Sequence, residues 1–576
     1  MIRPLLGLIL PATLTLALAL TPDRADACGG FFCDSGPQGM PVDQSGENIL
    51  FAFDGDSVEV HIQIAYDPNT DASKFSWVIP VSALPEFYVG SEVLFDNVLN
   101  GTVPFYGYTT SNELCGDGTD VGTGTGGFDP TTTTTAGTSS STGTGGPTIV
   151  YEATVGAFDV VVLQGGNTDE VVQWLNDNGY QQDPEAVPIL DAYLKEGNLF
   201  AAFKLAPADK PVVHPVVLRY QGVEPCVPIR LTRIAAVEDM DIRVFFLGDH
   251  RAIPTNYRHV LVNPLKIDWS TFGDNYKEVV TAAVDAFKAE GNAFVTEYAG
   301  PSAVISPFGL LDLSWDPKVF NGLWPTDVVD ELTKQSLVYC YDYGEVVCAY
   351  NHPLIQGLLL EHLPPPDGVS PDEFYYCLSC YEGMIDLLKW GDGSAFADAF
   401  AERIYDPGLR AENLLKSKPY VTRMYTTISP HEMLEDPVFF ENPDLPPIDS
   451  LRMAQRYLRC DGVTRYGLPD GRFVYLPSGA TWPEFPAEMP WEEETQQMAM
   501  AGAPLVLNNN TALIDGLLAE WNAKVLPGGE SLGDETASTS EDPPSGCGCT
   551  SDAGGGAIAT LGLVGLVGLA GRRRRR

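Results

Sequence analysis

The eleven cysteines of this 576-residue chain are the residues whose spacing points most directly to chemistry. We expect disulfides first, because the chain begins with an export signal and thiols oxidise outside the cytoplasm. Three close pairs are the candidates: Cys28 with Cys33, Cys340 with Cys348, and Cys377 with Cys380. Together, Cys340, Cys348, Cys377 and Cys380 could instead hold zinc, and Cys377-x-x-Cys380 could be a redox pair. Of the nine cysteines outside the C-terminal motif, at least one must be free, lipidated or intermolecular.

The histidines give weaker signals. The segment from His431 to Glu435 begins like the helical zinc-protease motif His-Glu-x-x-His, but its fifth residue is Glu, so a zinc ligand is missing. His250 and His259 lie where a strand is expected to enter a loop, which is a common place for functional groups. His214 and Cys226 flank the same expected sheet. We predict no metal site and no cofactor.

Acidic clusters occur at 54–56, 117–120 and 238–241, but none fits the twelve-residue calcium loop with its terminal Glu. Turns explain them better. The chain has no Gly-x-Ser-x-Gly elbow, no Walker loop and no dinucleotide-binding fingerprint. No motif therefore names a reaction, although catalytic groups can also come from distant positions in a chain.

The N-terminus has the pattern of a secretory signal peptide. Arg3 precedes an apolar run over 5–20, and Ala25-Asp26-Ala27 is a small-x-small cleavage site. Cleavage after Ala27 leaves Cys28 as the first mature residue, which a lipoprotein signal would also do. We expect residues 1–27 to be removed and the rest of the chain to be exported.

The C-terminus carries a second targeting pattern. Cys547 and Cys549 are followed by an apolar, glycine-rich run over 554–571 and then by five arginines. As a helix, this run is about 27 Å long, just enough to cross a bilayer. Residues 545–576 resemble the myxobacterial-type sorting signals, which combine a Cys motif, a transmembrane helix and an Arg cluster. The resemblance implies a sorting protease, an anchor at Cys547 or Cys549, and display at the cell surface. The alternative is a periplasm-facing tail anchor in the inner membrane.

The charge excludes one class of partner. Without residues 1–27 and the five terminal arginines, 27 basic and 75 acidic residues remain, a net charge of −48. Such a surface repels phosphate backbones, so we expect no binding to nucleic acid. The hydrophobic fraction of 44% is normal for a folded protein and is sufficient for a sizeable core.

Periodicity predicts a mixed α+β fold. Residues 58–66 alternate between apolar and polar side chains and predict a strand that forms a hairpin with 48–53, and 74–81 predicts a third strand with Trp77 in the core. Thr168 and Asp183 are expected to cap two helices. Further strands are predicted at 199–205, 214–221, 227–237 and 242–247, and further helices at 275–290, 372–388, 395–404, 491–501 and 511–523.

The pattern along the chain predicts a β-rich N-terminal domain over 28–298 and a mixed, mostly helical region over 299–526. The Gly/Thr/Ser-rich segment 116–147 interrupts the first domain, and its composition predicts disorder. A flexible linker is expected over 527–546, leading to the sorting signal over 547–576.

Several segments of the first half resemble one bacterial family, domain of unknown function 2330. The resemblance covers 28 to about 269 and is carried by Cys28-Gly29-Gly30-Phe31-Phe32-Cys33 and by the segments 44–51, 75–81, 229–249 and 251–257. It implies an exported protein, often anchored at the envelope. It implies no activity, so no catalytic residue can be assigned through it.

Taken together, the sequence favours a cell-surface envelope protein that binds an unidentified envelope ligand or has a structural role. The alternative is an exported hydrolase that acts on envelope polymers, with His250 and His259 as its candidate residues. A third class is a redox protein that uses Cys377 and Cys380.

Overall fold

The computed structural model describes residues 44–54, 57–66, 76–113, 147–180, 184–205, 214–222, 225–234 and 236–526. All of them belong to one compact unit. The predictions for 1–27, Cys28, Cys33, Cys547, Cys549 and the C-terminal segments from 527 onward concern residues outside this part of the chain. All but the last residue of the segment 116–147 also lies outside it.

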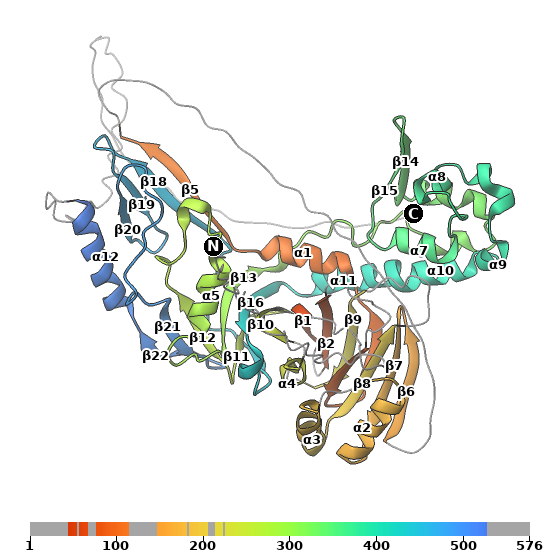
Figure 1. The fold of residues 1–576 in the computed structure, drawn as a ribbon, viewed down its shortest axis with the longest axis horizontal. Coiled ribbons are helices and arrows are strands. Elements are labelled where there is room, and N and C mark those ends of the chain that lie inside the picture. The colour runs from red at the N-terminus through yellow and green to blue at the C-terminus, as the bar shows by residue number, and fades with distance from the viewer. Residues whose placement is uncertain are drawn as a thin grey trace, which may run out of the picture. The chain divides into compact units, whose positions relative to one another are not determined.

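A mixed ten-stranded sheet, which we call the main sheet, organises the fold (Figure 1). β1 pairs in parallel with β10, as β12 does with β13, and the other neighbours are antiparallel. The strand order is β22 (Leu505–Asn509), β21 (Glu492–Gln497), β12 (Arg258–Val262), β13 (Ala293–Pro301), β16 (Tyr420–Ile428), β10 (Ala236–Gly248), β1 (Gln44–Asp54), β2 (Ser57–Tyr66), β9 (Val216–Gln221) and β4 (Glu86–Val89).

The predicted hairpin is confirmed as β1 and β2, whose register ends at the pair Asp54 and Ser57. The alternation in β2 separates its side chains between two faces of the sheet. Val60 and Ile62 belong to one hydrophobic core, whereas Glu59 and His61 point to the opposite face and are also buried. Glu59 and His61 are therefore polar residues that are buried on the face of the main sheet that packs against helices.

A second sheet packs on the face of the main sheet that carries Val60 and Ile62. Its order is β3 (Ser76–Val81), β8 (Leu199–Leu205), β7 (Phe158–Gln164) and β6 (Thr148–Val155). The predicted core residue Trp77 is 6% exposed, and its ring centre lies 5.1 Å from that of Phe203. α2 (Thr168–Asp177) and α3 (Ala186–Glu196) cover the outer face of this sheet (Figure 1).

The opposite face of the main sheet is covered by α1 (Glu92–Thr102) and α11 (Asp406–Ser417) (Figure 1). Ser91 caps α1, because its side-chain oxygen accepts a hydrogen bond from the Leu94 amide at 3.2 Å. Phe95 of α1 and Ala411 of α11 share a core with Leu50 of β1. The sequence of layers is thus α2 and α3, second sheet, main sheet, then α1 and α11.

A proline lies near each end of α11. The helix continues without a break from a π-helical turn over Ala401–Tyr405, and Pro407, which has no backbone N–H, lies just after this turn. Lys418 after the helix is extended, with φ −112° and ψ 108°, as expected for a residue before a proline. The C-terminal end of the helix is therefore fixed by Pro419.

The remaining elements form smaller groups. A four-stranded sheet of β20 (Phe473–Leu476), β19 (Thr464–Gly467), β18 (Leu451–Leu458) and β5 (Phe105–Asn112) packs with α12 (Thr511–Val525). Two hairpin-sized sheets pair β11 (Arg251–Pro254) with β17 (Phe439–Asn442) and β14 (Val338–Asp342) with β15 (Val346–Tyr350). The other helices are α4 (Ile229–Thr232), α5 (Tyr276–Val284), α6 (Val328–Lys334), α7 (Ile355–His362), α8 (Pro371–Tyr376), α9 (Leu387–Trp390) and α10 (Ser394–Phe400). In the described parts of the chain, no helix is both long and apolar enough to span a membrane.

Several predicted elements differ from the structure. The strand expected at 227–237 is the short helix α4 followed by the start of β10, and Pro225 and Pro228 remove the amides that a strand ladder would need there. The helix expected at 491–501 is strand β21, because its residues pair with β12. The helix expected at 372–388 ends at Tyr376. Asn167, rather than Thr168, caps α2. α3 begins at Ala186 with Glu185 at its N-cap position, and the predicted cap Asp183 lies outside the described residues.

The main sheet crosses the position at which we expected one domain to end. β16, from the region predicted to be mostly helical, lies between β10 and β13. Helices dominate 328–417, but the strands β16 to β22 follow them. Residues on both sides of 298 therefore share one sheet, and the α+β class applies to the described chain as a whole.

Candidate functional site

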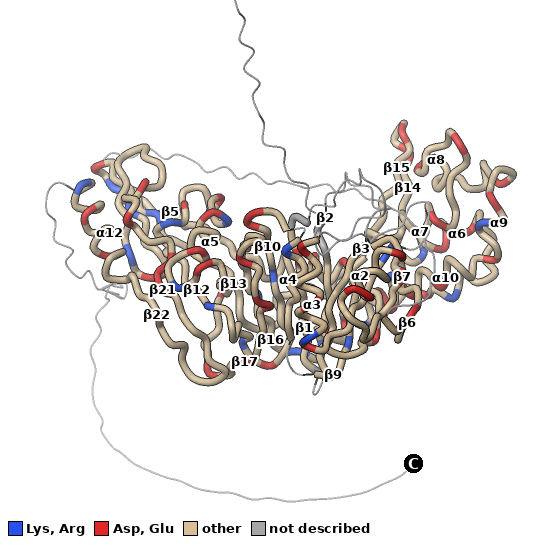
Figure 2. The backbone as a smooth tube through the Cα atoms, turned by 60° about the horizontal axis from the view of Figure 1, so that its bottom comes forward, with Lys and Arg blue, Asp and Glu red and all other residues tan. Residues whose placement is uncertain are grey.

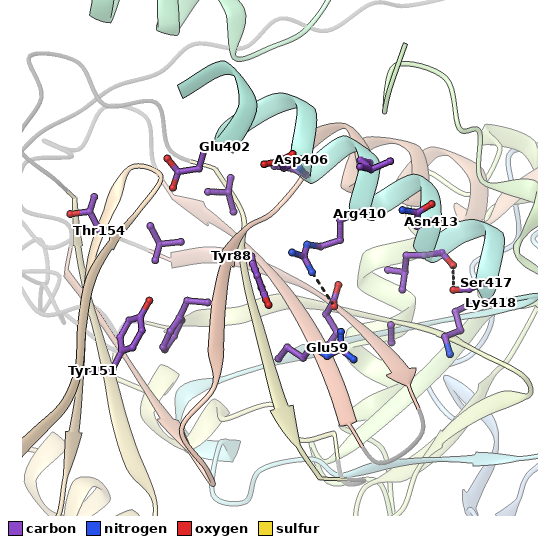
Figure 3. Close-up of a pocket in the computed structure, with 18 residues that line it drawn as sticks. Glu59, Tyr88, Tyr151, Thr154, Glu402, Asp406, Arg410, Asn413, Ser417 and Lys418 are labelled. Carbon is purple, nitrogen blue, oxygen red and sulfur yellow. Dashed lines mark hydrogen bonds and ion pairs between the residues drawn. The ribbon is translucent and has the colours of Figure 1, made fainter. Parts of the chain in front are cut away.

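A cleft of about 890 Å³ lies between α11 and the edge of the main sheet formed by β2, β9 and β4. Figure 3 shows α11 along one side, the strands opposite, and Tyr151 and Thr154 of β6 at one end. The side chains that line it combine three carboxylates, three cations and several aromatic rings. We call this space the cleft.

Glu59 of β2 lines the cleft and contacts two basic side chains. One of its carboxylate oxygens lies 3.0 Å from His61 Nε2 and the other lies 3.5 Å from Arg410 Nη1. Burial by itself raises the pKa of Glu59, but the hydrogen bond from His61 and the charges of His61, Arg410 and Arg219 outweigh it, so the pKa lies below its usual value. Glu59 is therefore an anion that holds Arg410 over the sheet.

Arg410 is also stacked on an aromatic ring. Its guanidinium carbon lies 3.8 Å from the ring centre of Tyr88, and the Tyr88 hydroxyl donates a hydrogen bond of 2.7 Å to Glu86. This hydrogen bond is the main reason that the pKa of Tyr88 is raised. A guanidinium held by a carboxylate and a ring face is oriented before any ligand arrives. Figure 3 places this pair in the middle of the cleft.

One end of the cleft is acidic. Glu402 accepts a hydrogen bond of 2.8 Å from the Gly156 amide, and Asp406 lies one turn further along the helical segment. Burial raises the pKa of Asp406, Arg410 opposes this rise, and Glu402 adds to it. Within the described chain, neither carboxylate has a basic group within ion-pair distance. This end therefore carries negative charge that no ion pair neutralises.

The other end is basic. Arg219 of β9 lies near Glu59, and its Nη2 donates a long hydrogen bond of 3.5 Å to Ser57. Lys418 lines the cleft just beyond α11 (Figure 3). The chain has 77 acidic and 34 basic residues, and the acidic positions are spread along the described backbone (Figure 2). Three cations in one cleft are thus a local departure from the acidic surface.

A second cavity of about 410 Å³ lies between the two stacked sheets, with apolar walls from residues such as Ile49 and Val60. Arg230 at its polar end pairs with Glu196 at 2.6 Å and with Asp436 at 2.9 Å. Tyr193 donates a hydrogen bond of 2.8 Å to Asp436. The cleft is larger and holds two carboxylates, Glu402 and Asp406, that form no ion pair in the described chain, so it is the better candidate for a ligand.

The two histidines predicted as hydrolase candidates occupy different environments. His250 is exposed in the turn between β10 and β11. His259 is 1% exposed, with Nε2 2.9 Å from the Thr296 hydroxyl and Nδ1 3.1 Å from Gln496 Oε1. Burial, together with the charge of Arg251, lowers the pKa of His259 to about 3. His259 is therefore a buried neutral group and neither histidine lines the cleft.

The other polar candidates also have structural surroundings. His214 is buried, accepts a hydrogen bond of 2.8 Å from the Ala157 amide and lies 2.8 Å from the Pro215 carbonyl oxygen. Cys226 lines the second cavity. His431 lies in a 3-10 turn, Pro430–Glu432, so the segment that resembles the zinc-protease motif is not an α-helix. Asp241 binds Lys277 at 3.0 Å.

Two predicted cysteine pairs lie at disulfide distance. The sulfur atoms of Cys340 and Cys348 are 1.97 Å apart, and those of Cys377 and Cys380 are 2.01 Å apart. Cys460 is disulfide-bonded as well. Sulfurs joined in this way are not available as zinc thiolates. Among the described residues, no group of three or more His, Cys, Asp or Glu side chains is placed to hold a metal ion.

Sequence reasoning missed the residues of the cleft. Glu59 was assigned only to the polar face of a strand, and no helix was predicted at α11, whose first residues Asp406-Pro407-Gly408 have the composition of a turn. An Asp before a Pro is also a helix-start signal, and Ala411, Leu414 and Leu415 follow with helical spacing. That signal could have identified the helix, but not its position over β2.

These features define an α+β protein with a charged cleft at one edge of its main sheet. The chain belongs to a bacterial family described as "Uncharacterized protein conserved in bacteria (DUF2330)", which matches residues 22–318. The match extends beyond the expected 28–269. It includes the strands below the cleft and ends before α11. No curated protein and no solved structure matches the chain. The family description assigns no activity.

Proposed function

We propose that this protein is exported, displayed at the cell surface, and binds a soluble polar ligand in the cleft. The observation that carries the binding proposal is the orientation of Arg410, fixed by Glu59 and by the face of Tyr88. The cleft volume of about 890 Å³ falls within the range usual for small-molecule sites. Groups held in place before binding lose little entropy when the ligand arrives.

Binding explains the carboxylate at the centre of the cleft better than catalysis does. Both oxygens of Glu59 are engaged, by His61 and by Arg410, and its pKa is lowered. A general base needs an oxygen that is open to the substrate and a pKa near the working pH. Glu59 therefore acts as a support for Arg410.

Export and display are proposed from the two ends of the chain. The signal-like segment 1–27 and the sorting-like segment 547–576 support a route across the membrane, with a sorting protease and an anchor at Cys547 or Cys549. Mass spectrometry of both termini of the cell-surface protein tests this part. A chain that starts at Cys28, ends near Cys547 or Cys549 and carries lipid is expected. A chain that retains 554–576 would leave a tail anchor instead.

Equilibrium dialysis tests the binding part. The purified full chain is dialysed against the small-molecule fraction of the cell envelope, and the retained solutes are identified by mass spectrometry. Asn413→Trp should abolish retention, because Asn413 is an exposed residue of α11 that lines the cleft.

Lys416→Trp is the matched control, since Lys416 lies on the same helix outside the cleft and forms only an exposed ion pair with Glu412. Wild type and the control should retain the same solute. If no solute distinguishes Asn413→Trp from the control, the cleft is not the binding site.

A further inference from the structure

We propose that the ligand of the cleft is a short peptide with a free ammonium group and a free carboxylate. This inference rests on the proposed binding function and names the class of ligand. It follows from the order of charges along the helical segment that borders the cleft, where two carboxylates come first and the cations follow.

The order of charges is visible in the spacing of the residues. Glu402, Asp406 and Arg410 follow one another at intervals of four residues, which places them on one side of the helical segment. All three line the cleft, and Figure 3 shows them in succession along the helix, with Lys418 at the far end. A ligand that lies along the helix therefore meets negative charge first and positive charge second.

The acidic end is suited to an ammonium group. Glu402 uses one carboxylate oxygen to accept a hydrogen bond from a backbone amide, and within the described chain the Asp406 side chain forms no hydrogen bond or ion pair. The two like charges raise each other's energy, and a bound cation would relieve this repulsion. An ammonium group can donate three hydrogen bonds, enough to reach both carboxylates.

The basic end is suited to a carboxylate. Arg410 and Arg219 both act on the carboxylate of Glu59, and Lys418 also lines this part of the cleft. Cations therefore predominate among the charged side chains that line it. A guanidinium group binds a carboxylate through two parallel hydrogen bonds, so Arg410 provides the geometry as well as the charge.

The distance between the two ends limits the length of the ligand. At 1.5 Å per residue of α-helix, Asp406 and Arg410 are about 6 Å apart along the axis, and Glu402, in the π-helical turn, lies about one turn further from Arg410. An extended peptide spans about 3.3–3.6 Å per residue. Two to four residues therefore fit. Tyr151, at the same end of the cleft as Glu402 (Figure 3), provides a ring face for a side chain, and Asn413, three residues after Arg410, provides an amide for the peptide backbone.

Calorimetry on the full chain with the tripeptide Ala-Tyr-Ala tests the proposal. We expect measurable binding of the free peptide and at least a tenfold loss of affinity for both the N-acetylated peptide and the C-terminal amide. Asp406→Asn should lower the affinity for the free peptide, and acetylation of the peptide should then cause no further loss. Arg410→Gln should also lower the affinity for the free peptide, and amidation should then cause no further loss. Lys416→Ala, outside the cleft, should leave the affinity and both effects of blocking unchanged.

Two outcomes overturn the proposal in different ways. If blocking either end of the peptide leaves affinity unchanged, or if no di-, tri- or tetrapeptide binds while dialysis still shows a solute that Asn413→Trp excludes, the ligand is not a free-ended peptide but the binding function stands. If dialysis also shows no such solute, the binding function itself fails.

Discussion

Single buried charges in this protein are held by specific partners. Arg423 of β16 donates a hydrogen bond from Nε to Glu297 of β13, and their side chains are 5% and 2% exposed. Arg423 also donates a hydrogen bond of 3.0 Å to the Leu99 carbonyl oxygen, which links the sheet to α1. The pair connects two strands of the main sheet to one of the helices that cover it.

Arg423→Met should destabilise the protein by about 3–5 kcal/mol, because it leaves the Glu297 carboxylate buried without its partner. Urea unfolding of the full chain measures this cost. The double variant Arg423→Met, Glu297→Leu should recover most of it, because no uncompensated charge remains. A cost below about 1 kcal/mol for the single variant would contradict this interpretation.

Buried neutral histidines should make the protein less stable in acid. The folded pKa of His259 is about 3, whereas an exposed histidine titrates near 6.5. Between these values the unfolded chain binds more protons, so the free energy of unfolding falls as pH falls through this window. His214 and His352, with pKa values lowered to about 4, act in the same direction.

His259→Gln should reduce the dependence of the unfolding free energy on pH between about 4 and 6.5, by up to about 1.4 kcal/mol per pH unit. Above pH 7 the slope should be unchanged. Urea unfolding at several pH values measures it. His431→Gln is the control, because the His431 side chain is 74% exposed. Equal slopes for the two variants would show that His259 is not held neutral.

At the scale of elements, the cleft depends on how closely α11 approaches the chain beside it. Gly408 lies in the first turn of α11, and a Cβ added there would overlap the Leu310 carbonyl oxygen, which is part of the backbone and cannot easily move. A glycine in a helix normally weakens it. Here the absence of a side chain allows the helix to lie where it borders the cleft.

Gly408→Ala should therefore destabilise the protein by about 1–3 kcal/mol and displace α11. Gly516→Ala in α12 is the matched control, because its added Cβ meets no atom within 4 Å. The control should stabilise the protein by about 0.5–1 kcal/mol. Thermal unfolding of both variants measures the difference. If both variants were more stable than wild type, α11 would not be packed tightly against the Leu310 backbone.

The elements that sequence reasoning found were those with a strong local pattern. β2 alternates cleanly, β8 was predicted with its observed bounds, and α12 was predicted to within two residues of its end. β21 was mistaken for a helix, because the partner that makes it a strand, β12, lies more than 200 residues earlier in the chain. Pairing at such a distance leaves no local signal.

At the scale of the whole molecule, the strand order explains why the domain boundary and the cleft could not be predicted. β16 enters the sheet between β10 and β13, and α11, which leads into β16, is thereby placed over β2. Glu59 and Arg410 meet although about 350 residues separate them. The α+β class could be predicted from composition and periodicity, but this contact could not.

The same strand order predicts that the family-matching segment does not fold alone. A chain that ends at residue 318 lacks β16, so β10 and β13 would each lose a central partner. We expect this fragment to show no cooperative unfolding transition, whereas the full chain shows one. Near-ultraviolet circular dichroism during heating provides the comparison. A sharp transition in the fragment would mean that 44–318 forms its own sheet.

Hydrogen–deuterium exchange tests the central claim, that the cleft binds a ligand, most directly. Exchange of the full chain is measured with and without the small-molecule fraction of the envelope. We predict slower exchange of backbone amides in α11 and β4, which lie on opposite sides of the cleft. Unchanged exchange in both elements, at a ligand concentration that protects other parts of the chain, would contradict the claim.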